Sequence, residues 1–86
     1  MTKEAMLLQI KRIVQDILGV QLGSGQLEVD LTELGMQSIL FIQIVVALEE
    51  EFECEIPDSK LLMSDMNTLG KMVDAVELAL TGDAEG

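Results

Sequence analysis

Residues 38–53, SILFIQIVVALEEEFE, are the densest apolar segment of the chain and constrain its fold more than any other. Several β-branched residues in it would suit a buried strand: Ile39, Ile42, Ile44, Val45 and Val46. The segment runs for about fifteen residues and ends in the helix-favouring ALEEEF, so a helix is the better interpretation. Ser38 would be its N-cap or first-turn residue. The face that we expect to be buried consists of Ile42, Val45, Leu48 and Phe52.

Two further segments have helical periodicity. In residues 3–18 the apolar residues recur at intervals of three and four: Met6, Leu7, Ile10, Ile13, Val14, Ile17 and Leu18. Gly19 is a plausible stop signal for this helix. Thr68 is an N-cap candidate for a last helix, whose apolar positions are Leu69, Met72, Val73, Val76 and Leu80.

The connections complete the predicted architecture. Residues 19–36 form a long, glycine-containing first loop, in which Asp30 is a candidate cap for a short turn at 31–34. Pro57 ends the second helix, and residues 57–63 predict a short helical turn opened by Asp58. The sequence therefore predicts an all-α fold: a small four-helix bundle, with three main helices, a short third helix and a long first loop. We expect one domain over residues 1–86, with a helical core at about 3–80 and a frayed tail at 81–86.

Charge and cysteine content limit the environment and the partners. The net charge of −11 argues against nucleic acid and anionic membranes. From Ile13 to Ser59 there is no Lys or Arg, whereas ten acids fall in that span, which favours basic partners. The only cysteine, Cys54, is better interpreted as a buried structural thiol than as a reactive one. A chain without a disulfide, a signal peptide or a segment long enough to span a bilayer is expected in the cytoplasm.

The sequence lacks the residues that several kinds of catalytic and metal-binding site require. There is no histidine, tyrosine or tryptophan, which removes histidine-based nucleophile systems and zinc sites, and one cysteine cannot form a cysteine-only site. Residues 30–41 have a glycine at the sixth position of a calcium loop, but positions three, five and twelve are Thr32, Leu34 and Phe41 and lack the expected carboxylates. The acids crowd one helix end, where a solvated surface is the simpler interpretation. We therefore expect no metal and no autonomous enzyme.

The order of motifs is more specific. Along the chain follow, in order, LGMQSI, an apolar helix, ALEEEF, IPD and a TL that opens the last helix. This order of motifs resembles the acyl carrier protein family, over about residues 3–80. The resemblance implies that Ser38 is joined to 4′-phosphopantetheine, transferred from coenzyme A by a phosphopantetheinyl transferase. The thiol of that group would carry acyl, aminoacyl or peptidyl intermediates as thioesters to partner enzymes of fatty-acid, polyketide or nonribosomal-peptide biosynthesis. A serine at a helix start suits a phosphate independently of the resemblance.

Departures from the family pattern indicate a specialised discrete carrier. Gln37 replaces the usual aspartate before the serine, and Leu40, Phe41 and Gln43 stand where fatty-acid carriers tend to hold acids or polar residues. Partners would therefore dock on a mixed face of the carrier. Its apolar residues would make the contact, and its acidic residues would attract and orient a basic partner. The docking residues that we predict are Met36, Gln37, Ile39, Leu40, Phe41, Ile44, Glu49 and Glu50.

The expected partners are a phosphopantetheinyl transferase and synthases, ligases or acyltransferases with basic docking patches. We expect the carrier itself to be a monomer. A different class of function stays open: an unmodified acidic adaptor that binds a basic protein through residues 49–53. Ser38→Ala would leave that adaptor functional, whereas charge reversal at Glu49 and Glu50 would abolish its binding.

Overall fold

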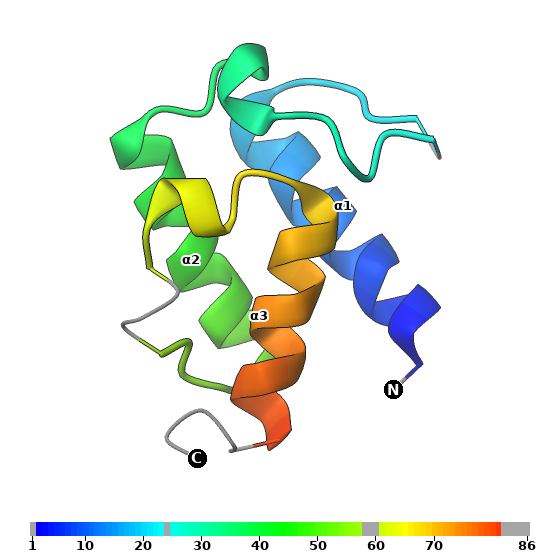
Figure 1. The fold of residues 1–86 in the computed structure, drawn as a ribbon, viewed down its shortest axis with the longest axis vertical. Coiled ribbons are helices and arrows are strands. Elements are labelled where there is room, and N and C mark those ends of the chain that lie inside the picture. The colour runs from blue at the N-terminus through cyan, green and yellow to red at the C-terminus, as the bar shows by residue number, and fades with distance from the viewer. Residues whose placement is uncertain (1, 24, 58–60, 82–86) are drawn as a thin grey trace.

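The structure, a computed structural model, describes residues 2–23, 25–57 and 61–81. In these ranges it contains three α-helices, two 3-10 turns and no strand, so the predicted all-α class is confirmed (Figure 1). The elements in chain order are α1 Lys3–Leu18, η1 Leu31–Leu34, α2 Ser38–Phe52, η3 Met63–Asp65 and α3 Leu69–Thr81.

The ends of α1 follow from local sequence. At its start, the side chain of Thr2 accepts a hydrogen bond of 3.1 Å from the backbone N–H of Ala5. At its end, Gly19 has a φ of 71°, in the left-handed region, and its N–H donates to the carbonyl of Gln15. The helix predicted over residues 3–18 and its glycine stop are confirmed.

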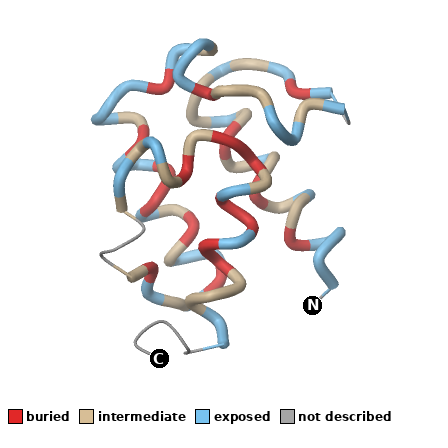
Figure 2. The backbone as a smooth tube through the Cα atoms, in the orientation of Figure 1, coloured by how far each residue is buried: buried red, intermediate tan, exposed pale blue. Residues whose placement is uncertain are grey.

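The core lies where the three α-helices meet, and α1 packs against both α2 and α3. Each helix contributes side chains that are almost completely buried, as the red segments of Figure 2 show. They include Ile10 and Val14 from α1, Leu48 from α2, and Met72 and Val76 from α3. The 3-10 turns sit at one end of this bundle, beside the N-terminus of α2 (Figure 1).

The prediction of which α2 face is buried was wrong at one position. Ile42 is exposed, and the buried residues of α2 are Phe41, Ile44, Val45, Leu48 and Phe52. The two faces compete because α2 is apolar on most sides, so periodicity alone selects neither of them. The observed rotation buries both phenylalanines of the chain, which have the largest apolar area to remove from water.

The short third helix also differs from its prediction. Of the predicted range 57–63, residues 58–60 lie outside the described part of the chain, while Leu61 and Leu62 are not helical. The helical turn follows at Met63–Asp65 and is of the 3-10 type. The predicted tail at 81–86 lies outside the described residues except for Thr81, which ends α3. Among the described helices, none combines the length and the apolar character needed to cross a bilayer.

Candidate functional site

The loop before α2 is shaped by the turn η1. The carboxylate of Asp30 accepts hydrogen bonds from the backbone N–H of Thr32 at 3.0 Å and from its hydroxyl at 2.6 Å. These bonds lower the pKa of Asp30, the side-chain bond most, and confirm it as the cap of this turn. Gly35 ends the turn with a φ of 106°, a conformation that disfavours any side chain. The chain then runs directly into α2.

Two backbone hydrogen bonds tie this loop to the start of α3. Leu31 N–H donates to the carbonyl of Asn67 at 2.7 Å, and Gly70 N–H donates to the carbonyl of Leu27 at 3.2 Å. The side chains of Leu31 and Met36, which belong to this segment, are buried in the core. The entry into α2 is therefore held by contacts with a helix that lies more than thirty residues later in the sequence.

Ser38 is the first residue of α2 and its side chain is exposed. The N-cap position belongs to Gln37, which is extended and makes no side-chain capping bond. The sequence left open whether Ser38 is a cap or a first-turn residue, and the structure places it in the first turn. Within the described residues, no hydrogen bond engages the Ser38 hydroxyl. That oxygen is therefore accessible to a modifying enzyme.

The surroundings of Ser38 suit a phosphodiester. Because Gln37 supplies no capping oxygen, the first N–H groups of α2 are open to an acceptor near Ser38. The first turn of α2 contains no acid. The first carboxylate along this helix, Glu49, lies eleven residues further on, roughly 16 Å along the axis. The positive end of the helix dipole therefore faces a phosphate here without a competing charge on the same helix.

The predicted docking residues separate into three groups by exposure. Gln37, Ile39 and Glu50 are exposed, while Leu40 and Glu49 are half-buried. The structure does not support a surface role for the remaining three, because they are buried in the core: Met36, Phe41 and Ile44. The rotation of α2 turns the latter two toward its neighbours, and Met36 belongs to the same core. Ile42 and Val46 were not among the predicted docking residues, although both are exposed at helical spacing from Ile39. The sequence carries no signal for them, because α2 is apolar on most sides and its periodicity does not select one face.

Glu49 has a structural contact of its own. Its carboxylate accepts a hydrogen bond of 2.9 Å from the backbone N–H of Ile56, and its carbonyl accepts one of 3.1 Å from Cys54 N–H. These bonds fold the chain back against the end of α2. Burial raises the pKa of the Cys54 thiol, and the nearby Glu49 charge raises it further, which supports the interpretation of an unreactive thiol.

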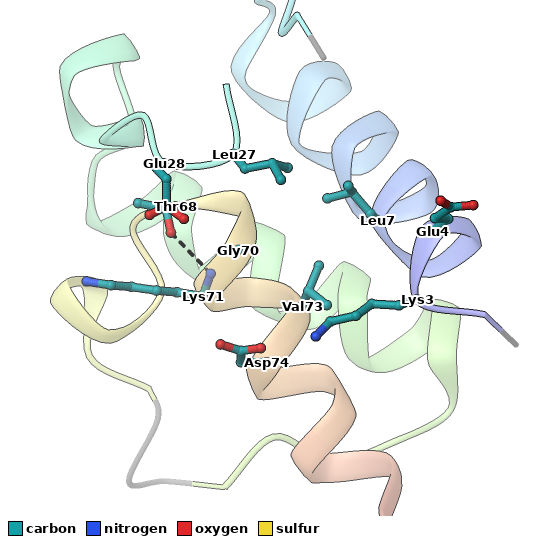
Figure 3. Close-up of a pocket in the computed structure, with 10 residues that line it drawn as sticks. All are labelled: Lys3, Glu4, Leu7, Leu27, Glu28, Thr68, Gly70, Lys71, Val73 and Asp74. Carbon is teal, nitrogen blue, oxygen red and sulfur yellow. Dashed lines mark hydrogen bonds between the residues drawn. The ribbon is translucent and has the colours of Figure 1, made fainter. Parts of the chain in front are cut away.

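A cavity of about 520 Å³ lies between α1 and the start of α3, and none of the predicted site residues lines it (Figure 3). Leu7, Leu27 and Val73 form its apolar part, and both cationic and acidic side chains surround them. The ammonium of Lys71 is already used, because it donates to the carbonyl of Ser64 at 3.0 Å and to the side chain of Asn67 at 3.1 Å.

Comparisons with known proteins find similar sequences over most of the chain. The family described as the phosphopantetheine attachment site matches residues 9–76. An acyl carrier protein of Tropheryma whipplei (strain Twist) is 36% identical over 77 residues, which cover 88% of this chain and 92% of that protein.

Proposed function

The chain belongs to the acyl carrier protein family, and on that premise we propose that Ser38 is the residue to which its 4′-phosphopantetheine is attached. Such proteins carry intermediates and do not catalyse reactions, so the chain supplies a tether for partner enzymes. The observation that carries the assignment is the exposed Ser38 hydroxyl at the open N-terminus of α2, directly after the turn that Gly35 ends.

The chain's own residues present the serine hydroxyl and favour the product of the attachment step, which the transferase catalyses. A phosphopantetheinyl transferase must bring the phosphorus of coenzyme A to the Ser38 oxygen. A P–O bond to serine forms, the bond to 3′,5′-ADP breaks, and the hydroxyl proton leaves to a base of that enzyme. Because no hydrogen bond within the described residues restrains the hydroxyl, the attack needs no rearrangement of α2. The first-turn N–H groups lie where they favour the phosphodiester product. When attached, the group supplies a thiol that holds acyl, aminoacyl or peptidyl cargo as a thioester.

The finer assignment is a specialised discrete carrier for fatty-acid, polyketide or nonribosomal-peptide biosynthesis, acting as a monomer in the cytoplasm. Gln37 and the exposed isoleucines that follow Ser38 support specialisation, because they remove acidic character from the start of α2. The sequence holds a single cysteine, which cannot form an intramolecular disulfide, and this supports a reducing compartment. The partners would be the transferase and the synthases, ligases or acyltransferases of that pathway.

The decisive experiment is incubation of the purified chain with coenzyme A and a broad-specificity phosphopantetheinyl transferase, followed by intact mass measurement. We expect a mass increase of one phosphopantetheine group in the wild type and none in Ser38→Ala. Ser64→Ala is the matched control, because Ser64 is also exposed and belongs to η3, and it should take up the group normally. An unmodified wild type beside a fully modified control carrier would overturn the proposal. It would favour the alternative of an acidic adaptor.

A further inference from the structure

The cavity of about 520 Å³ between α1 and the start of α3 is formed by three segments of the chain (Figure 3). Leu7 belongs to α1, Leu27 to the first loop and Val73 to α3, and together they make up its apolar lining. Leu7 and Leu27 point toward one another. The N–H of Gly70 donates a hydrogen bond of 3.2 Å to the carbonyl of Leu27, which holds the loop against α3 at the cavity. A space of this volume is large enough for a small molecule.

The cations and the acids that line the cavity differ in their contacts. The ammonium of Lys3 lies 3.7 Å from the carboxylate of Glu77, which is not part of the lining. Lys71 points away from the apolar lining, and its ammonium donates to Ser64 and Asn67. Within the described residues, no hydrogen bond or salt bridge engages the carboxylates of the three acids that line the cavity: Glu4, Glu28 and Asp74. The cavity therefore combines an apolar lining with an excess of unpaired negative charge.

Gly70, in the first turn of α3, leaves the cavity open at a position where a helix favours almost any side chain over glycine. Its φ is not positive, so its backbone does not require glycine. A Cβ at this position would lie 3.6 Å from a carboxylate oxygen of Glu28 and 3.7 Å from the carbonyl oxygen of Leu27, which are ordinary contact distances. Packing does not require glycine either. What the missing side chain provides is space for a ligand beside Glu28.

We propose that this cavity binds a small aliphatic ammonium compound. Its methylene groups would contact Leu7, Leu27 and Val73, and its ammonium groups would lie against the carboxylates of the lining. A fatty carboxylate or a phosphate would instead meet like charge, both in the lining and on a chain of net charge −11. The inference goes beyond the function proposed for Ser38 and does not depend on it, because Ser38 does not line the cavity.

The arrangement of the acids favours an organic cation over a metal ion. In the part of the chain that the structure describes, no group of three or more acidic or cysteine side chains is placed so that it could hold a metal. A metal ion would also gain nothing from the apolar lining. An aliphatic ammonium compound uses both features, because its carbon chain leaves water while its charge faces the carboxylates.

The test titrates hexamethylenediamine into the isotope-labelled chain at about 150 mM salt, which screens long-range attraction, and follows the backbone amides by NMR. Hexylamine and hexanol are the matched ligands, with one charge and none. Glu28→Gln/Asp74→Asn, the lining pair, removes two charges from the cavity. Asp16→Asn/Glu33→Gln, the control pair, removes two charges from exposed positions outside it. Gly70→Leu fills the open position with a good helix former.

We expect the diamine to bind the wild type with a Kd of about 1 mM and to shift the amides of Leu27, Glu28 and Gly70 most. The lining pair should raise this Kd by about tenfold or more, and the control pair by less than about twofold. Gly70→Leu should weaken binding as much as the lining pair without lowering the melting temperature. Hexylamine should bind more weakly than the diamine, and hexanol more weakly still. Ser38→Ala should bind the diamine as the wild type does.

Three results would overturn the inference. Equal weakening by the lining pair and the control pair, with shifts spread over all acidic segments, would show attraction to net charge alone. Hexanol binding as tightly as the diamine would remove the role of the carboxylates. An unchanged Kd in Gly70→Leu would place the ligand outside the cavity, and the lining pair decides the question independently if leucine disturbs the fold. None of these results bears on Ser38, whose modification is measured separately by mass.

Discussion

The backbone N–H of Leu31 donates a 2.7 Å hydrogen bond to the carbonyl oxygen of Asn67, and this bond joins the turn before Ser38 to the segment before α3. The side chain of Leu31 is fully buried at the same place. The position of Ser38 therefore depends on tertiary contacts as well as on the local turn. Damage to the loop anchor should affect both stability and presentation of the serine.

Leu31→Ala should lower the free energy of unfolding by about 2–5 kcal/mol, because it removes a fully buried side chain and leaves a cavity. Chemical denaturation measures this loss. Leu34→Ala is the control in the same turn and should cost less, since Leu34 is only partly buried. Equal losses at the two positions would contradict the role of Leu31 as the anchor.

The unfilled cap of α2 gives a prediction about stability. Gln37→Asp should raise the free energy of unfolding by about 0.5–1 kcal/mol, because aspartate accepts hydrogen bonds from first-turn N–H groups and complements the helix dipole. Gln43→Asp adds the same charge at an exposed mid-helix position and should not stabilise the chain. Ser38→Ala should cost less than about 0.5 kcal/mol, because the serine is exposed and does not cap the helix. Thermal unfolding of the three variants and the wild type, compared by melting temperature, checks these three expectations.

The sequence predicted the bounds of α1 well because its apolar residues recur on one face and its stop signal, Gly19, is local. It could not select the buried face of α2, where Ile39, Ile42 and Val46 are as apolar as the residues that enter the core. Tertiary packing decides between two such faces. The hydrogen bond from Ile56 N–H to the Glu49 carboxylate could not be predicted from the sequence either, since it joins a helix to an irregular segment that has no periodic pattern.

Asp30 should make stability depend on pH in the acid range. Its hydrogen bonds with Thr32 lower its pKa below the ordinary value of 3.8. Its contribution is therefore fully present above 3.8 and is lost as the pH falls through the lowered value of the folded state. The difference in melting temperature between the wild type and Asp30→Asn should accordingly shrink when the pH is taken from neutral to below that value. Glu33→Gln, an exposed acid of the same turn, is the control for net charge, and an equal narrowing there would contradict the assignment to Asp30.

Cys54 should react slowly with iodoacetamide at neutral pH, because a raised pKa leaves little of the nucleophilic thiolate. Glu49→Gln keeps an oxygen for the Ile56 N–H but removes the nearby charge, so it should increase the alkylation rate. The increase should be smaller than the slowing that burial causes, since burial is the larger cause of the raised pKa. Glu51→Gln removes a charge from an exposed position of the same helix. A similar acceleration in that variant would show that net charge is responsible instead of the Glu49 contact.

Glu53 ends α2 in a conformation that glycine adopts more readily. Its φ of 51° and ψ of 52° lie in the left-handed region, and it is the only residue other than glycine with a positive φ in the described part of the chain. Glu53→Gly should therefore raise the free energy of unfolding by about 0.5–1 kcal/mol, the relief of backbone strain exceeding the extra entropy of glycine in the unfolded chain. Glu53→Gln removes the same charge without relieving the strain. Denaturation of the two variants side by side separates the causes: a gain of equal size in both would trace the effect to charge repulsion at the acidic end of α2 and contradict the strain at Glu53.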